Sequence, residues 1–261
     1  MKIIVCVKQV PDTTEVKIDP KTGTLIREGV PSILNPDDAN ALEEALQIKD
    51  NNEGTTVSVV TMGPPQAEVM LRECLSMGAD DAYLISDRAF AGSDTWATSN
   101  AIASAIRKIG DYDIVFAGRQ AIDGDTAQVG PQISEKLDIP QVTYVQKCNV
   151  ENDEIIVHRQ LEDGYEVIKV KKPVLFTAVK ELNSPRYMAV DKIFEAYQKP
   201  ITVWNIKDLD INQDVVGIKA SPTKVFKSFT PAPKGKGLMM QGTTQDAVEQ
   251  LLVKLKQKHV I

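Results

Sequence analysis

Residues 118–130, with the sequence GRQAIDGDTAQVG, combine residue types that could do chemistry. The segment follows an apolar run and precedes a predicted helix, so its main-chain N–H groups and the helix N-terminus could hold an anion. Thr126 and Gln128 could add side-chain donors. Asp123 and Asp125 would repel a phosphate and suit a ribose hydroxyl or an adenine amino group better. The residues alone leave two interpretations open, a nucleotide-binding loop and a plain acidic turn.

Spacing excludes two other kinds of site for this segment. An EF-hand loop starting at Asp123 needs a ligand at its fifth position, glycine at its sixth and glutamate at its twelfth. The sequence has Ala127, Gln128 and Ser134 there. A P-loop is also excluded, because no Gly-Lys-Ser/Thr follows the glycines.

Two further segments follow predicted strands and could reach the same place. Gly63 begins a Gly-Pro-Pro turn, where the main chain could approach a ligand closely. The Gly-Pro pair is also common in ordinary turns. Residues 92–99 (GSDTWATS) place Asp94, Thr95 and Thr98 at the start of a predicted helix. Their polar side chains indicate either more phosphate contacts or a simple helix cap.

The elements that must position these loops alternate regularly over the first 137 residues. Predicted strands cover residues 3–7, 56–62, 82–85 and 113–117, and predicted helices begin at residues 36, 66, 94 and 129. Asn35 is predicted to cap the first of these helices, with Pro36 at its first position. Because parallel strands need crossover helices, the pattern predicts a doubly wound, mainly parallel, Rossmann-like α/β sheet. Ligands bind such sheets at the carboxyl ends of the strands.

The pattern changes after residue 140. Three runs of alternating polarity, with turn signals at residues 152–153 and 163–164, predict antiparallel strands, and the last run enters the sheet at 174–179. We therefore predict an α/β domain over 1–182, a loop and short helix over 183–200, and an arm over 201–261. The arm shows little periodicity before a terminal amphipathic helix. It either packs on its own domain or wraps a partner.

Composition narrows the function classes. The chain has 261 residues, a formal charge of −6 and 5% aromatic residues, which argues against nucleic-acid binding. No apolar run approaches the ~20 residues that span a bilayer, and the N-terminus does not resemble a signal peptide. The three cysteines lack CxxC spacing and there are only two histidines. We therefore expect a cytoplasmic protein without a metal centre, a membrane partner or a nucleic-acid partner.

Seven ordered stretches resemble the β subunit of an electron-transfer flavoprotein. They span essentially the whole chain: VCVKQVPDT, NPDDANALEEAL, VVTMGPPQAE, GADDAYLISD, GRQAIDGDTAQVGP, RQLEDGYEVIKVKKPVLFTAV and NSPRY. The sixth corresponds to the family's diagnostic pattern and departs from it at Phe176, where a smaller aliphatic residue is usual.

The resemblance implies an adenine-nucleotide-binding α/β domain in a heterodimer with an α subunit that carries a flavin. Nucleotide contacts carried over by motif fall on Cys6, Asn35, Asp38, Met62, Gly63, Gly118, Arg119, Gln120, Ala121, Ile122, Asp123, Gly124, Asp125, Thr126, Ala127, Gln128 and Val129. In the housekeeping branch of the family the nucleotide is AMP. In the electron-bifurcating branch of anaerobic bacteria it is a second FAD, which accepts hydride from NADH.

The segments SDRAFAGSDTWATS and GDTAQVGP resemble the bifurcating branch, which adds Asp94, Thr95 and Thr98 as expected FAD contacts. One electron would pass through the α-subunit flavin to an acyl-CoA dehydrogenase-like or lactate dehydrogenase-like flavoenzyme, and the other to ferredoxin or flavodoxin. The resemblance also makes 183–200 a docking loop with Val190 at its tip, and 201–261 an arm that wraps the α subunit. The alternatives are a surface helix with an incidental valine and, in another class, a stand-alone ATP-binding α/β module.

Overall fold

The computed structural model of the chain describes residues 1–12, 17–18, 25–26, 31–151, 154–226 and 234–261. By its internal contacts the chain divides into two units, Met1–Val225 and Phe226–Ile261. The first unit contains the large sheet and its covering helices, and the second contains helix α7 (Thr244–Gln257).

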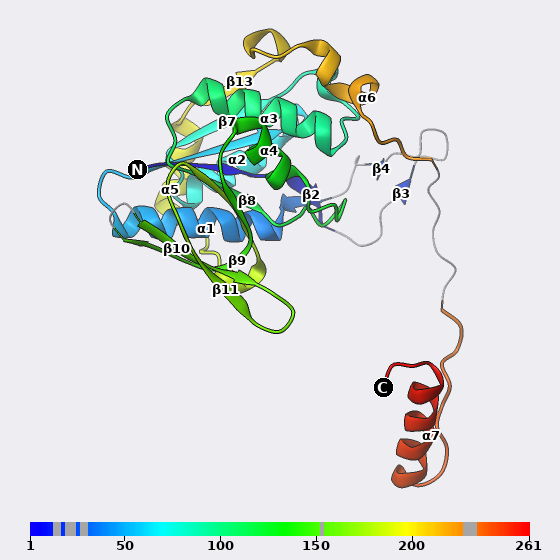
Figure 1. Cartoon of the computed structure of the whole chain (residues 1–261). Helices are drawn as coiled ribbons and strands as arrows, with labels where there is room; N and C mark the ends of the chain where they lie inside the picture. Colours follow the sequence, from blue (N-terminus) through cyan, green and yellow to red (C-terminus); the bar gives the residue numbers. More distant parts are fainter. Residues whose placement is uncertain (13–16, 19–24, 27–30, 152–153, 227–233) are drawn as a thin grey trace. The chain divides into compact units, whose positions relative to one another are not determined.

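Among the described residues, nine strands form the main sheet, in the order β11-β10-β9-β12-β8-β1-β6-β7-β13 (Figure 1). The pairs from β9 to β13 are parallel, and β10 and β11 add an antiparallel edge. This order confirms the predicted α/β sheet. The strands are β1 (Lys2–Cys6), β6 (Thr56–Met62), β7 (Asp81–Ile85), β8 (Ile114–Gly118), β9 (Gln141–Glu151), β10 (Glu154–Gln160), β11 (Tyr165–Val170), β12 (Val174–Ala178) and β13 (Ile201–Trp204).

Helices cover both faces of the sheet. Helices α1, α2 and α5 contribute to the core on one face, and α3 and α4 to the core on the other. The continuous apolar run of β1 follows from this arrangement, because Ile3 and Val5 face the first group while Ile4 and Cys6 face the second. The bounds are α1 (Pro36–Asn51), α2 (Glu68–Met77), α3 (Thr95–Ile109), α4 (Val129–Leu137), α5 (Val190–Gln198) and α6 (Gly217–Ala220).

Residues after 200 contain a strand that the sequence does not predict. Strand β13 pairs in parallel with β7 and is the edge strand on that side of the sheet. Its Trp204 ring packs on Tyr83 at a centroid distance of 5.0 Å and carries the ammonium of Lys108 at 4.8 Å. Four residues are too short for a periodicity signal, so tertiary packing decides this strand.

Shorter elements complete the first unit. Strand β2 (Gln9–Pro11) pairs with β5 (Ser32–Leu34), and β3 (Lys17–Ile18) pairs with β4 (Leu25–Ile26). The turn predicted at 152–153 lies outside the described residues. Single turns of 3₁₀ helix are η1 (Pro65–Ala67), η2 (Arg88–Phe90), η3 (Lys180–Leu182), η4 (Ile206–Asp208) and η5 (Gln213–Val215).

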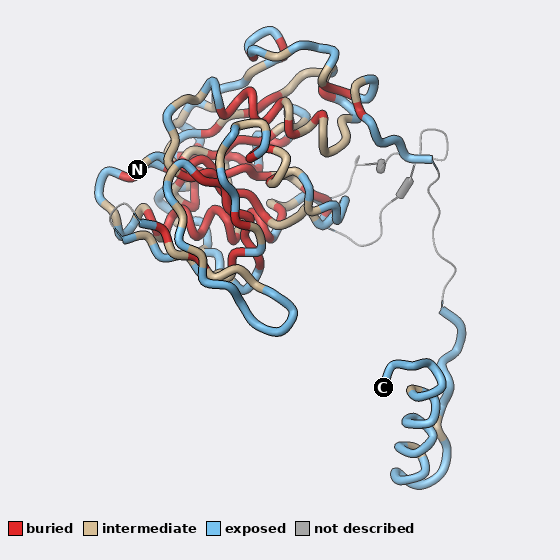
Figure 2. Tube along the Cα trace, in the orientation of Figure 1, coloured by how far each residue is buried: buried red, intermediate tan, exposed pale blue. Residues whose placement is uncertain are grey.

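Helix α7 of the second unit is well formed and begins with a defined cap. Thr243 and Asp246 form a reciprocal capping box at its start. No residue of α7 is buried, in contrast to the interior of the first unit (Figure 2). None of the described helices is both long and apolar enough to cross a bilayer.

Candidate functional site

The predicted loops converge where the strand connections change direction. Strand β1 has β8 on one side and β6 on the other, and all three run parallel. Their carboxyl ends therefore meet at one edge, beside the point where the chain switches sides of the sheet. We call this place the crevice, and residues 118–130 the crevice loop.

Asn35 fastens the crevice loop to the start of α1. It occupies the predicted N-cap position of α1, although its side chain makes no capping hydrogen bond. Instead, Asn35 Nδ2 donates to the Gln120 carbonyl at 2.8 Å, and the Ile122 N–H donates to Asn35 Oδ1 at 3.1 Å. The side chain is fully buried, so these bonds hold the loop in place without competition from water.

Asp38 ties together the ends of two strands. Its Oδ2 accepts from the Lys8 N–H at 2.8 Å and its Oδ1 from the Gly118 N–H at 2.9 Å. Burial raises the pKa of Asp38 to about 7, although the hydrogen bonds from Asn35, Gly118 and Lys8 act in the opposite direction. Both carboxylate oxygens are thus occupied by protein donors, which makes Asp38 a bridge beneath the crevice.

Two ion pairs lie at the crevice. Lys8 Nζ lies 2.6 Å from Asp123 Oδ1, and Arg119 Nε lies 3.3 Å from Asp37 Oδ2 without the alignment of a hydrogen bond. Burial raises the pKa of Asp37 and the Arg119 charge opposes that effect. Sequence reasoning did not single out Lys8 or Asp37. Lys8 lies two residues after the end of β1, and this position near a strand end is the sequence feature that could have indicated it.

The second half of the crevice loop presents main-chain donors. Asp125 and Ala127 have positive φ angles of 46° and 51°, and such alternation turns successive N–H groups toward one side. Within the described residues, none of the five consecutive N–H groups at 126–130 has a hydrogen-bond acceptor. Helix α4 begins at Val129, and no side chain caps it. This arrangement is a ready anion site.

Two glycines of the loop are required by close packing. A Cβ on Gly118 would lie 2.4 Å from Asp38 Oδ1, and one on Gly130 would lie 2.7 Å from Thr177 Cγ2. Gly124 differs, because a Cβ there would meet no atom within 4 Å. The main chain at Gly124 is therefore open to a ligand.

The residues predicted at the start of α3 divide into two groups. Thr95 touches the crevice loop, since its Oγ1 donates to Gln128 Oε1 at 2.9 Å. Asp94 caps α3 through the Ala97 N–H, and its Oδ2 accepts from the N–H and the hydroxyl of Thr223 at 2.9 and 2.7 Å. Thr98 is half-buried and donates its N–H to the Asp94 carbonyl. The structure brings only Thr95 of these three onto the loop.

Cys6 ends β1 as a packed side chain. It is 7% exposed, and burial raises the pKa of its thiol well above the ordinary range. This burial makes Cys6 a packed side chain whose thiol is not poised for reaction.

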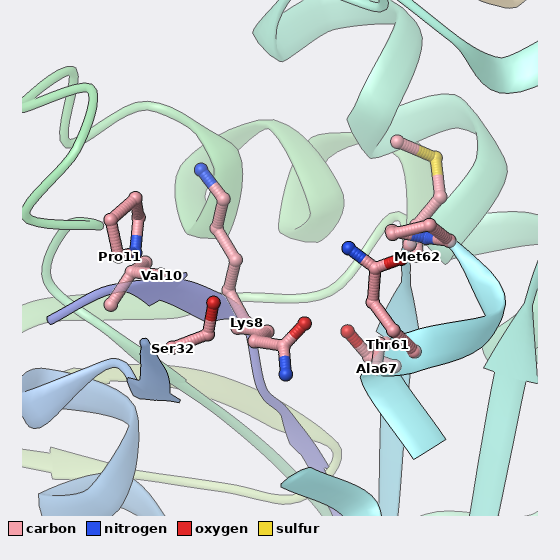
Figure 3. A pocket seen from close by; sticks show the side chains of 11 residues that line it. Lys8, Val10, Pro11, Ser32, Thr61, Met62 and Ala67 are labelled. Carbon is pink, nitrogen blue, oxygen red and sulfur yellow. The ribbon is translucent and has the colours of Figure 1, made fainter. Parts of the chain in front are cut away.

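Met62 and Gly63 line a hollow at the ends of β1 and β6. In Figure 3, Lys8 stands between Val10 and Pro11 on one side and Met62 on the other. The hollow formed by the described residues has a volume of about 50 Å³, well below the roughly 300–1,000 Å³ of a ligand pocket. A nucleotide bound here would need further residues to enclose it.

Fold and site together define a doubly wound α/β protein with a loop of exposed main-chain donors at its topological switch point. The electron transfer flavoprotein domain matches residues 22–209, and the chain belongs to the electron transfer flavoprotein family. It is 64% identical to the caffeyl-CoA reductase-Etf complex subunit CarD of Acetobacterium woodii. It is 59% identical to the electron transfer flavoprotein subunit beta of Clostridium acetobutylicum and 54% identical to the acryloyl-CoA reductase electron transfer subunit gamma of Anaerotignum propionicum. Each match covers 100% of both chains.

Proposed function

We propose that this chain is the β subunit of a heterodimeric electron-bifurcating flavoprotein. In this proposal its crevice binds FAD, NADH is the electron donor, and the electrons are divided. One goes to ferredoxin or flavodoxin, and one goes through the α-subunit flavin to an acyl-CoA dehydrogenase-like or lactate dehydrogenase-like partner. The names of the relatives support an acyl-CoA partner, because two of them belong to caffeyl-CoA and acryloyl-CoA reductase systems.

The observation that carries the proposal is the row of N–H groups at 126–130, which have no acceptor among the residues that the structure describes, beside the open main chain at Gly124. These groups suit a pyrophosphate, which supplies several acceptor oxygens and negative charge at a helix N-terminus. The acidic side chains of Asp123 and Asp125 lie at the other half of the loop. That polarity would orient a dinucleotide with its phosphates toward α4.

The flavin, when bound, supplies the ability to accept two electrons together and release them singly. The protein's own contribution is position and electrostatics. Asn35 and Asp38 fix the loop and the strand ends, and Thr95 supports Gln128 from α3. Since the hollow beside Met62 is small, the α subunit would supply the missing wall.

The deciding experiment is the flavin and nucleotide content of the purified α/β pair. The proposal predicts two FAD molecules per heterodimer and bleaching of the flavin absorbance by NADH. One FAD and one AMP, with no response to NADH, would instead assign the chain to the housekeeping branch. A stable monomer that binds ATP would support the stand-alone module, against which the long arm after residue 200 argues.

A further inference from the structure

Helix α1 buries polar residues on a side away from the apolar core. Asn40, Glu43 and Glu44 are 4%, 4% and 5% exposed. Carboxylates are rarely buried to this degree unless they are paired. We therefore expect the chain segment that packs over these three residues to supply their hydrogen-bond or ion-pair partners.

That segment is the predicted docking loop, residues 183–200, which we call the docking segment. Its first residue, Asn183, donates from Nδ2 to Glu44 Oε2 and to the Asn40 carbonyl, both at 3.0 Å. In return, Asn40 Nδ2 donates to the Asn183 carbonyl at 2.7 Å. This reciprocal pairing fixes the main chain where it leaves the sheet.

Arg186 makes the second attachment, with a charge. Its Nε and Nη2 donate to the two carboxylate oxygens of Glu43 at 2.8 and 3.1 Å, and its main-chain N–H also donates to Glu43 at 3.0 Å. Asp50 lies 2.8 Å from the same Nη2. Burial alone would raise the pKa of Glu43, yet the bonds from Arg186 and Gln47 bring it below its usual value. A paired arginine fork of this kind gives geometric precision as well as energy.

The far end of the docking segment is held from α2. Arg72 Nη1 donates to the carbonyls of Ala196 and Lys199, both at 2.5 Å. Between the two attachments, Val190 and Phe194 are 74% and 73% exposed. The segment thus presents apolar side chains from a frame that is fixed at both ends.

Helix α1 bonds both Arg186 and the strand ends at the crevice. The first turn of α1 carries Asp38, which bonds the ends of β1 and β8, and about one and a half turns later the same helix carries Glu43. A rigid helix that bonds both places sets their separation and orientation.

Accepting the proposed function, we propose that Glu43 and Arg186 are positioning residues for electron transfer. Their ion pair, in which Glu43 is buried and Arg186 is half-buried, seats the docking segment on the helix that also anchors the crevice loop. A dehydrogenase that docks on Val190 is thereby held at a set place relative to the crevice. Neither residue touches the nucleotide.

The test compares Glu43→Gln with wild type in the purified heterodimer. Hydrogen exchange should accelerate about tenfold or more across residues 184–199, because the buried carboxylate that pairs with Arg186 loses its charge. Exchange across 118–130 should stay unchanged. Glu53→Gln, the same charge change at an exposed site just past α1, should change neither region. Unchanged exchange at 184–199, or an equal rise in both regions, would overturn the positioning role.

A kinetic comparison separates positioning from general stability. With the caffeyl-CoA reductase of Acetobacterium woodii as electron acceptor, Glu43→Gln should raise KM for the acceptor about tenfold. The rate of flavin reduction by NADH should be unchanged. Arg186→Lys keeps the charge but loses the fork, so its KM should fall between the two. A lower rate of NADH oxidation with unchanged KM would contradict the inference. The exchange measurement needs no flavin, so a heterodimer lacking FAD would count against the proposed function alone.

Discussion

Gly118 and Gly124 occupy the same loop but need to be glycine for different reasons. Gly118 packs so closely on the start of α1 that an added methyl group would lie 2.4 Å from Asp38 and 2.7 Å from the main chain of Asp37. Gly118→Ala should therefore lower the free energy of unfolding by about 1–3 kcal/mol, the usual cost of overpacking. Urea denaturation of the purified protein measures this. Gly124→Ala, at an open position, is the matched control, and equal losses in both variants would contradict the packing argument.

A substitution at Gly124 tests nucleotide binding and not the stability of the fold. Its φ is not positive and a Cβ would meet no atom within 4 Å, so Gly124→Val should leave unfolding nearly unchanged. If the main chain approaches a ligand there, a branched side chain should block it and reduce the nucleotide retained on purification by about tenfold. Gly164→Val places the same change at another open glycine, in the turn before β11. Full nucleotide content in Gly124→Val would remove Gly124 from the site.

At the residue level, the sequence located the loop but not its internal bonds. The glycine spacing and the following helix identify 118–130 as a candidate site. The local pattern also predicted Asn35 as a helix cap, whereas its side chain bonds to Gln120 and Ile122, more than 80 positions away in the chain. Asp94 likewise has a partner, Thr223, that no local pattern indicates. Propensities describe neighbours in sequence, and these contacts depend on the tertiary fold.

At the level of elements, helix α1 makes stability depend on pH. Burial raises the pKa of Glu44 to about 7; the Glu43 charge acts in the same direction and the Asn183 bond against it. The folded protein then holds a proton between about pH 4.3 and 7 that the unfolded chain releases. Stability from this group is present at low pH and is lost as pH rises toward 7, with a slope of up to about 1.4 kcal/mol per pH unit.

Glu44→Gln should remove that slope while it keeps an acceptor for Asn183. Unfolding free energies measured from pH 5 to pH 8 should fall less steeply in the variant than in wild type. Glu53→Gln, which alters an exposed acid, should leave the wild-type slope in place. A variant slope equal to that of wild type would show that Glu44 ionises in the folded protein much as it does in the unfolded chain.

Longer elements were predictable and the shortest were not. Strong periodicity and end signals located α4 at the predicted residues, because Val129–Leu137 has an apolar stripe and a clear start. The start of α1 was also predicted, but nothing in its sequence pattern indicated that Glu43 and Glu44 are buried. A helix pattern identifies the side that meets an apolar core, but not a second side that meets a polar segment from 140 positions later.

At the level of the whole molecule, helix α7 exposes an apolar stripe that its own unit leaves uncovered. Val248, Leu251 and Leu252 are 51%, 47% and 44% exposed. If this stripe packs on the α subunit, Leu252→Asp should weaken the heterodimer at least about tenfold, since burial of such a side chain is worth about 1.5–3 kcal/mol. Val253 is 52% exposed and points about 100° away from Leu252 around the helix axis. Val253→Asp is therefore the control. The subunit Kd from sedimentation decides the matter, and equal values for the two variants would contradict packing through this stripe.

The proposed docking of a partner dehydrogenase at Val190 concerns the larger complex that this enzyme forms with the heterodimer. Val190 begins α5, is 74% exposed, and belongs to a segment attached at both ends by arginines. Val190→Asp should place a charge in an apolar contact and slow electron transfer to the acyl-CoA dehydrogenase-like partner by about tenfold or more. Reduction of the flavin by NADH should be unaffected, because the crevice loop is bonded to α1 and α3 and not to α5. Val203→Asp makes the same change at a 56% exposed valine on β13 and should leave both rates as in wild type. If Val190→Asp lowered both rates equally, the loss would lie in the crevice or in folding, and the docking role would have to be abandoned.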